Sequence, residues 1–194
     1  MSGVSLVLIE GLEREGLEGR TILDLGCGVG GLTRTLLARG AARATGMDLS
    51  PASVAEASRL AGEAGLADRA TYLIGDAAVA PLAVHDVVVM NKVVCCYPDP
   101  AALMSSAIEA AAGVVAFALP DSRGLKGVIV RFGLAVFNIG PRIRRSAFRV
   151  FAHDVRPMLS ALERAGFEPR TDTRFRMWRA LVYARAATVT VGGR

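Results

Sequence analysis

A glycine-rich turn that directly follows a short apolar run is the feature that most restricts how this chain can fold. Residues 21–25 read Thr-Ile-Leu-Asp-Leu, and four of the next six residues are glycine. An apolar run of this length, bounded by glycine, is typical of a buried strand in a parallel sheet. A helical pattern follows from Gly31 to about Arg39 and ends at Gly40. The segment therefore predicts a strand–turn–helix unit of an α/β sheet.

Short apolar runs alternate with helical patterns along the rest of the chain, and no repeat or low-complexity linker divides it. This alternation predicts helices on both faces of a mostly parallel sheet. We therefore expect residues 1–194 to form a single domain, in which 1–20 contribute a short N-terminal helix. Further strands are predicted at 44–48, 70–74, 86–90, 114–119, 167–176 and 178–186, and helices at 4–15, 51–64, 100–112 and 155–165.

The composition excludes several classes of protein. With 194 residues, of which 52% are hydrophobic, the chain can bury a substantial core, and intrinsic disorder is excluded. Three cysteines are too few for a disulfide scaffold, so we expect a reduced, cytoplasmic protein. The sequence has neither a signal-peptide pattern nor an uncharged apolar run of the roughly 18 residues that span a bilayer. We therefore expect neither a leader nor a membrane helix.

The glycine turn allows more than one ligand. Gly26, Gly28 and Gly31 satisfy the Gly-x-Gly-x-x-Gly spacing of a dinucleotide site, so a nicotinamide-dependent oxidoreductase is one interpretation. A pyrophosphate needs backbone N–H groups and a helix N-terminus that face the anion. Asp24, two residues before the first glycine, would repel phosphates but would suit a cationic amino group. The acid therefore favours a nucleoside ligand that has an amino group and no phosphate.

Three acidic positions together resemble the class I S-adenosylmethionine-dependent methyltransferases. They are Asp-x-Gly-x-Gly-x-Gly from Asp24 after a buried strand, Asp48 at the end of the second strand, and Gly75-Asp76 at the end of the third. The resemblance implies an α/β, Rossmann-like sandwich with a seven-stranded, mostly parallel sheet of order 3-2-1-4-5-7-6, in which the last strand is antiparallel. It also implies an enzyme that uses S-adenosyl-L-methionine.

The resemblance assigns roles to individual residues. Asp48 is expected to hold both ribose hydroxyls, a task that suits a carboxylate because it accepts two hydrogen bonds. Leu49 would pack on the adenine, Asp76 would accept from its amino group, and Ala77 would offer a backbone N–H. Asn91 is expected to line the methionine end. The complete predicted cofactor set is Asp24, Gly26, Cys27, Gly28, Gly30, Asp48, Leu49, Asp76, Ala77 and Asn91. No metal site is predicted.

The segment after the fourth strand is similar to a subgroup of small methyltransferases with a Val-Cys-Cys-Tyr-Pro-Asp motif, here at 94–99. A Phe-Arg…His element at 148–153 supports the same resemblance, whereas the subgroup's Pro-Arg after the fifth strand is Pro120-Asp121 in this chain. Tyr97 is predicted to line the substrate pocket, with proton transfer as a second option. His153 is the best candidate for a general base, and a role as a helix cap or surface residue stays open. The two adjacent cysteines of the motif are interpreted as buried thiols.

Basic residues concentrate in one segment. Residues 122–153 hold seven arginines and lysines and no acidic residue, so the rest of the chain carries a net charge of −2. We predict that 122–153 form a basic and apolar lid over the substrate. Peripheral membrane contact through 124–149 is the alternative, and a nucleic-acid partner is not expected.

The predicted reaction is methyl transfer to a small-molecule acceptor that is apolar and, as one option, anionic, with O-methylation favoured. A hydroxyl acceptor needs a base, whereas a carboxylate does not. The alternatives are a non-catalytic or membrane-associated protein that binds S-adenosylmethionine, and a nicotinamide-dependent oxidoreductase. The oligomeric state stays open.

Overall fold

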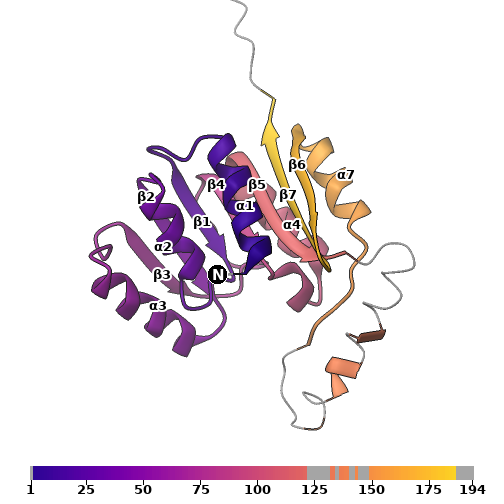
Figure 1. Ribbon diagram of the computed structural model, residues 1–194, viewed down its shortest axis with the longest axis horizontal. Helices are drawn as coiled ribbons and strands as arrows, with labels where there is room; N and C mark the ends of the chain where they lie inside the picture. Colours follow the sequence, from indigo (N-terminus) through magenta and orange to yellow (C-terminus); the bar gives the residue numbers. More distant parts are fainter. Residues whose placement is uncertain (1, 122–131, 134–135, 140–142, 144–148, 187–194) are drawn as a thin grey trace, which may run out of the picture.

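A seven-stranded sheet forms the centre of the molecule (Figure 1). The computed structural model describes residues 2–121, 132–133, 136–139, 143 and 149–186. The strand order is β3-β2-β1-β4-β5-β7-β6, with β1 to β5 parallel and β7 antiparallel to both β5 and β6, which confirms the predicted topology. The strands are β1 (Thr21–Leu25), β2 (Arg43–Asp48), β3 (Ala70–Ile74), β4 (His85–Asn91), β5 (Ala111–Pro120), β6 (Phe167–Phe175) and β7 (Trp178–Arg185).

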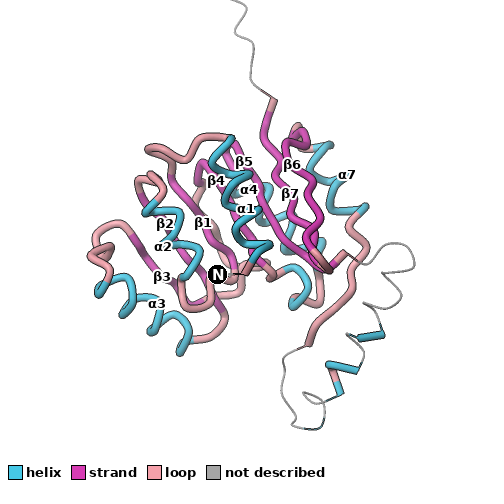
Figure 2. Tube along the Cα trace, in the orientation of Figure 1, coloured by secondary structure: helices cyan, strands magenta, loops and turns pink. Residues whose placement is uncertain are grey.

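Helices cover both faces of the sheet (Figure 2). One core cluster joins α1 and α2 to the sheet, and a second cluster joins α4 and α7 to the opposite face. The helices are α1 (Gly3–Arg14), α2 (Gly31–Ala38), α3 (Pro51–Glu63), α4 (Pro100–Ala110) and α7 (Arg156–Arg164), with a 3₁₀ helix η1 (Val94–Cys96). Among the described helices, none is long and apolar enough to cross a membrane.

The central strands are apolar on both sides because both faces are covered. Ile22 of β1 packs in the cluster beneath α1 and α2, whereas Leu23 and Leu25 pack in the cluster beneath α4 and α7. The run Val88–Met90 of β4 is fully buried in the same alternating way. This double burial explains why these strands appear as continuous apolar runs in the sequence.

One predicted boundary is wrong. The helix expected to end near residue 112 ends at Ala110, and the fifth strand, expected from 114, begins at Ala111. The run Ala110–Ala112 contains no glycine or proline to mark the change. Strand pairing determines this boundary instead, because Ala111 lies opposite His85 at the start of β4. The sheet therefore determines where the helix stops.

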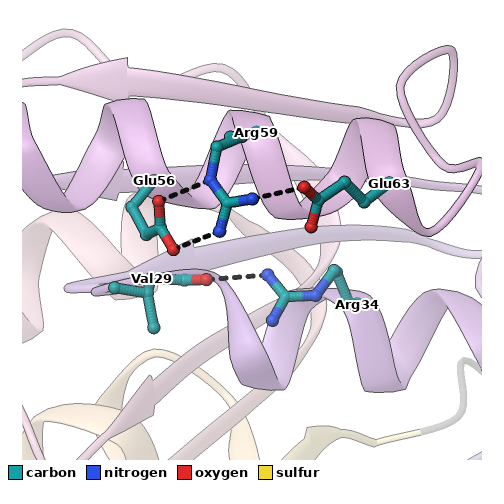
Figure 3. Close-up of polar contacts among 5 residues, drawn as sticks. All are labelled: Val29, Arg34, Glu56, Arg59 and Glu63. Atoms are coloured by element: carbon teal, nitrogen blue, oxygen red, sulfur yellow. Dashed lines mark hydrogen bonds and ion pairs between the residues drawn. The ribbon is translucent and has the colours of Figure 1, made fainter.

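Arginines on α3 and α2 make the polar contacts drawn in Figure 3. Arg59 lies between Glu56, at 2.6 Å, and Glu63 one turn further along α3. These groups are exposed, so water screens the pairs and they add little stability. On α2, Arg34 Nη1 donates to the carbonyl oxygen of Val29 at 2.7 Å. That contact ties the start of α2 to the glycine-rich turn.

The predicted lid lies largely outside the described residues, and so does the alternative membrane-contact stretch 124–149. The large apolar side chains described between 132 and 143 are all more than half exposed: Phe132, Val136, Phe137, Ile139 and Ile143. The chain is described again without interruption from Arg149. From there it approaches the loop after β4, because the Phe151 N–H donates to the Cys95 carbonyl oxygen at 2.6 Å.

Candidate cofactor-binding site

Two adjoining cavities lie at the carboxyl ends of the parallel strands, where ligands bind in open α/β sheets. The first, of about 410 Å³, is lined by residues that follow β2, β3 and β4. The second, of about 350 Å³, lies between the glycine turn, the end of β4 and the start of α1. Gly26 and Lys92 line both cavities. Together the cavities form one crevice along the sheet edge.

Glycine is required at position 26 both by the backbone conformation and by the close approach of a neighbouring side chain. Its φ is +69°, and a Cβ at this position would lie 2.2 Å from a methyl group of Val93. Its N–H donates to the Met47 carbonyl oxygen at 2.7 Å, which ties the turn after β1 to the end of β2. Glycine is therefore what lets the loop after β4 approach the turn closely.

Asp48 joins the glycine turn to the start of α3. Its Oδ2 accepts the Gly28 N–H at 2.8 Å, and its Oδ1 accepts the Ser50 N–H at 2.9 Å. A carboxylate has about four acceptor positions, so each oxygen keeps capacity for a second donor. Leu49, the next residue, is 61% exposed and lines the first cavity. The pair offers acceptors for a diol beside an apolar side chain.

Asp76 lies across the first cavity, at the end of β3. Its Oδ1 accepts the Ala78 N–H at 3.0 Å, and the Tyr97 hydroxyl donates to both carboxylate oxygens, at 2.7 and 2.9 Å. Burial, followed by the Asp76 carboxylate, raises the pKa of Tyr97 to about 12. The phenol therefore keeps its proton at neutral pH and acts as a donor. Ala77 lines the same cavity.

Asp24 lies beneath the second cavity and is almost fully buried. Its Oδ2 accepts the Thr33 hydroxyl at 2.7 Å. Burial raises the pKa of Asp24 to about 7, and the nearby Asp48 charge contributes to the rise. A cationic group in this cavity would favour the ionised form. Cys27 lines the same cavity as a neutral thiol, because burial raises its pKa to about 12.

Five residues that line the second cavity are outside the predicted cofactor set: Ser2, Ser5, Gly31, Leu32 and Lys92. Ser2 and Ser5 come from the start of α1, and Ser5 Oγ accepts the Asn91 Nδ2–H at 3.0 Å. Lys92 adopts a left-handed φ of 63°, unusual for a residue with a side chain, and so turns the chain away at the end of β4. Serines on an amphipathic helix carry no signal of such a contact, because Ser5 and Asn91 are 86 residues apart.

The structure brings together most of the predicted cofactor residues. Nine of the ten line one or both cavities. The exception is Gly30, which adopts φ +70° and immediately precedes α2. Tyr97 lines the first cavity, whereas His153 lines neither of the two. His153 Nε2 lies 2.9 Å from the Tyr97 carbonyl oxygen, and its ring stacks on Phe151 with centroids 5.4 Å apart. Its role as a base stays a prediction.

The Val-Cys-Cys-Tyr-Pro-Asp motif at 94–99 lines the first cavity and also has a structural role. Cys95 and Cys96 lie in η1 as free thiols, with their sulfur atoms 3.7 Å apart, and Cys96 lines the first cavity. Asp99 begins α4, because its Oδ1 accepts the N–H groups of Ala101 and Ala102, both at 3.0 Å. The motif therefore forms one wall of the cavity and also starts the helix beneath it.

Replacing Asp99 with alanine tests this structural role. We expect the free energy of unfolding to fall by about 1 kcal/mol, because two N–H groups of the first helical turn lose their acceptor. The affinity for a nucleoside ligand should stay within about twofold, since the side chain does not line the cavity. Urea unfolding and ligand titration measure the two quantities. A large loss of affinity at unchanged stability would contradict a capping role.

Comparison with known proteins gives a consistent result. Residues 22–115 match the model of a family described as a methyltransferase domain. This segment, from β1 into β5, is therefore similar to a methyltransferase domain. The chain is 37% identical over 62 residues to "Probable tocopherol O-methyltransferase, chloroplastic" of rice, Oryza sativa subsp. japonica. The match covers 32% of this chain and only 17% of the rice protein.

Solved structures share the fold of this chain over nearly its whole length. Magnesium protoporphyrin IX methyltransferase (ChlM) from Synechocystis PCC 6803, with bound SAH, superposes with a TM-score of 0.73 at 24% identity, over 94% of this chain and 81% of that chain. An S-adenosylmethionine-dependent methyltransferase from Mesorhizobium loti superposes with a TM-score of 0.70 at 20% identity. This match covers 93% of this chain and 96% of that chain. At these identities the likeness establishes the fold.

Proposed function

We propose that this chain binds S-adenosyl-L-methionine in the crevice and transfers its methyl group to a small apolar acceptor. The observation that carries the proposal is the position of three acids, Asp24, Asp48 and Asp76, which lie at or near the carboxyl ends of β1, β2 and β3 and line one crevice. Asp48 suits a ribose diol, and Asp76 suits an exocyclic amino group. Asp24 and Asn91 in the second cavity suit the amino-acid part of the ligand.

The arrangement argues against a dinucleotide. A pyrophosphate would have to lie against the turn between β1 and α2, directly above Asp24. A buried acid that can ionise near neutral pH disfavours two phosphate charges and favours an ammonium group. The residues present therefore fit S-adenosylmethionine better than a nicotinamide cofactor.

When bound, S-adenosylmethionine would supply an electrophilic methyl group on its sulfonium, with a neutral thioether as the leaving group. The protein contributes mainly position and exclusion of water. Asp48 and Asp76 fix the nucleoside end, and Asn91, held by Ser5, fixes the other end. The acceptor's lone pair forms the new bond to the methyl carbon as the carbon–sulfur bond breaks. A hydroxyl acceptor must also lose a proton, for which we propose His153; a carboxylate acceptor needs no base.

We propose O-methylation of an apolar acceptor with an acid group as the most specific form of this activity. The exposed apolar side chains between 132 and 143 and the basic character of 122–153 support it. The fold shared with ChlM, a magnesium protoporphyrin IX methyltransferase, is compatible with such an acceptor. Clustered arginines recognise carboxylates well because their planar donors match two oxygens.

Titration of the purified protein tests the cofactor proposal. We expect S-adenosylhomocysteine to bind at least tenfold more tightly than NADH in isothermal calorimetry. Incubation with methyl-labelled S-adenosylmethionine and an extract of small apolar acids should then yield a labelled product. Tighter binding of NADH would reject the proposal. Cofactor binding without turnover on any fraction would favour the non-catalytic alternative.

A membrane-associated protein that binds the cofactor is the second candidate function. The observation in its favour is that the described apolar side chains between 132 and 143 are exposed in a segment rich in arginine. Flotation with vesicles containing anionic phospholipid tests it. Recovery with these vesicles and not with zwitterionic ones would support membrane contact, and the absence of flotation would reject it.

A further inference from the structure

Tyr97 directs its hydroxyl at the acid that faces the nucleoside. The phenol donates to both oxygens of Asp76, at 2.7 and 2.9 Å, although the two residues lie on different loops and 21 positions apart. Both side chains line the first cavity. The hydroxyl is therefore committed to a residue of the cofactor-binding set, and it lies on the nucleoside side of the crevice.

The Tyr97 hydroxyl leaves Asp76 able to bind another donor. One phenol proton is shared between the two oxygens, and the Ala78 N–H occupies a further position on Oδ1. Of the roughly four acceptor positions of a carboxylate, Oδ2 keeps one open. An amino group on a purine ring can therefore bind Asp76 while Tyr97 stays in place. The phenol holds the carboxylate in one orientation by hydrogen bonding to both of its oxygens.

The backbone of Tyr97 is fixed from a different direction. Its carbonyl oxygen accepts the Nε2–H of His153 at 2.9 Å, and its N–H points to the Val94 carbonyl oxygen at 3.4 Å. The neighbouring Cys95 carbonyl accepts the Phe151 N–H at 2.6 Å. The side chain that reaches Asp76 therefore starts from a loop held by the segment before α7. A group with a fixed backbone can hold its partner in place with little loss of entropy.

We infer that Tyr97 is a positioning residue for adenine recognition: its hydroxyl orients Asp76 toward the 6-amino group of the bound cofactor. The inference rests on the proposed function, because it assumes an adenosyl ligand in the first cavity. It assigns Tyr97 to cofactor selectivity, a role different from proton transfer to or from the acceptor. His153 then supports the same recognition through the loop that carries Tyr97.

The test compares two ligands and two variants by calorimetry. The ligands are S-adenosylhomocysteine and its 6-deamino analogue, which has hydrogen in place of the purine amino group. For Tyr97→Phe we expect the Kd for S-adenosylhomocysteine to rise about tenfold, the scale of one hydrogen bond to a charged group. The Kd for the 6-deamino analogue should change less than about twofold. In an Asp76→Ala background, Tyr97→Phe should have no further effect on either ligand.

Tyr183→Phe is the matched control, because Tyr183 is buried in the core on β7 and lines neither cavity. It should leave both Kd values unchanged. Equal weakening of the two ligands by Tyr97→Phe would indicate general loosening and overturn the inference. A fall in kcat at unchanged affinity would overturn it in favour of a catalytic role. If the wild-type protein binds neither ligand, the proposed function itself fails, so the two failures are distinguishable.

Discussion

Asp48→Ala is expected to raise the Kd for S-adenosylhomocysteine about 100-fold, equivalent to about 3 kcal/mol. The variant loses two acceptors for the ribose hydroxyls, and hydrogen bonds to a charged group contribute about 1.5–3 kcal/mol each. It also leaves the Gly28 and Ser50 N–H groups without the acceptor they share. The turn and the start of α3 are therefore affected together. Calorimetric titration gives the affinity, and urea unfolding gives the accompanying loss of stability.

Asp68→Ala provides the matched control for this variant. Asp68 is exposed in the turn before β3, at the edge of the sheet opposite the crevice. The same chemical change there should leave the affinity unaltered. An Asp48→Ala protein that binds S-adenosylhomocysteine as tightly as the wild type would reject the ribose assignment.

Asp24→Asn is expected to stabilise the protein at pH 8 while weakening cofactor binding. Burial raises the pKa of Asp24 from 3.8 to about 7. Between these two values the folded protein holds a proton that the unfolded chain has lost, so wild-type stability falls as the pH rises through this range. Above pH 7 the loss of unfolding free energy caused by the raised pKa is constant, at about 4 kcal/mol. Below pH 4 the acid is neutral in both states and the cost disappears.

The asparagine variant removes this pH dependence because its side chain does not titrate. It also keeps an oxygen that can accept the Thr33 hydroxyl. The difference in unfolding free energy between variant and wild type should therefore grow from pH 4 to pH 8 when measured in urea. The Kd for S-adenosylhomocysteine should rise at pH 8, since the variant has no charge for the amino group. A constant stability difference across this range would show that Asp24 does not titrate as inferred.

The parts of the site that depend on local spacing were predictable. The turn from Gly26 and the acids Asp24, Asp48 and Asp76 all lie at or near the carboxyl ends of strands that the apolar runs indicate. Parallel strands place their carboxyl ends at one edge, so the topology brings these acids together. The strand order itself followed from the family resemblance and was confirmed.

Contacts between distant segments were not predictable. Nothing in the sequence pairs Ser5 with Asn91, or the Tyr97 hydroxyl with Asp76, because each pair forms only after the sheet has assembled. The change from helix to strand at Ala111 was not predictable for the same reason. A run of alanines fits either structure, and pairing with the neighbouring strand determines which one forms. Sequence patterns predicted the elements and the acids, and tertiary packing determined their partners.

The different exposure of the three thiols allows alkylation to report whether the first cavity is occupied. Cys27 and Cys95 are at least nine-tenths buried, whereas Cys96 is partly exposed on the wall of the first cavity. An alkylating reagent should therefore modify one sulfur preferentially, and a molecule seated in that cavity should shield it. Mass spectrometry of the intact chain after brief alkylation would then rank unknown compounds by protection, without a label and before any acceptor is identified.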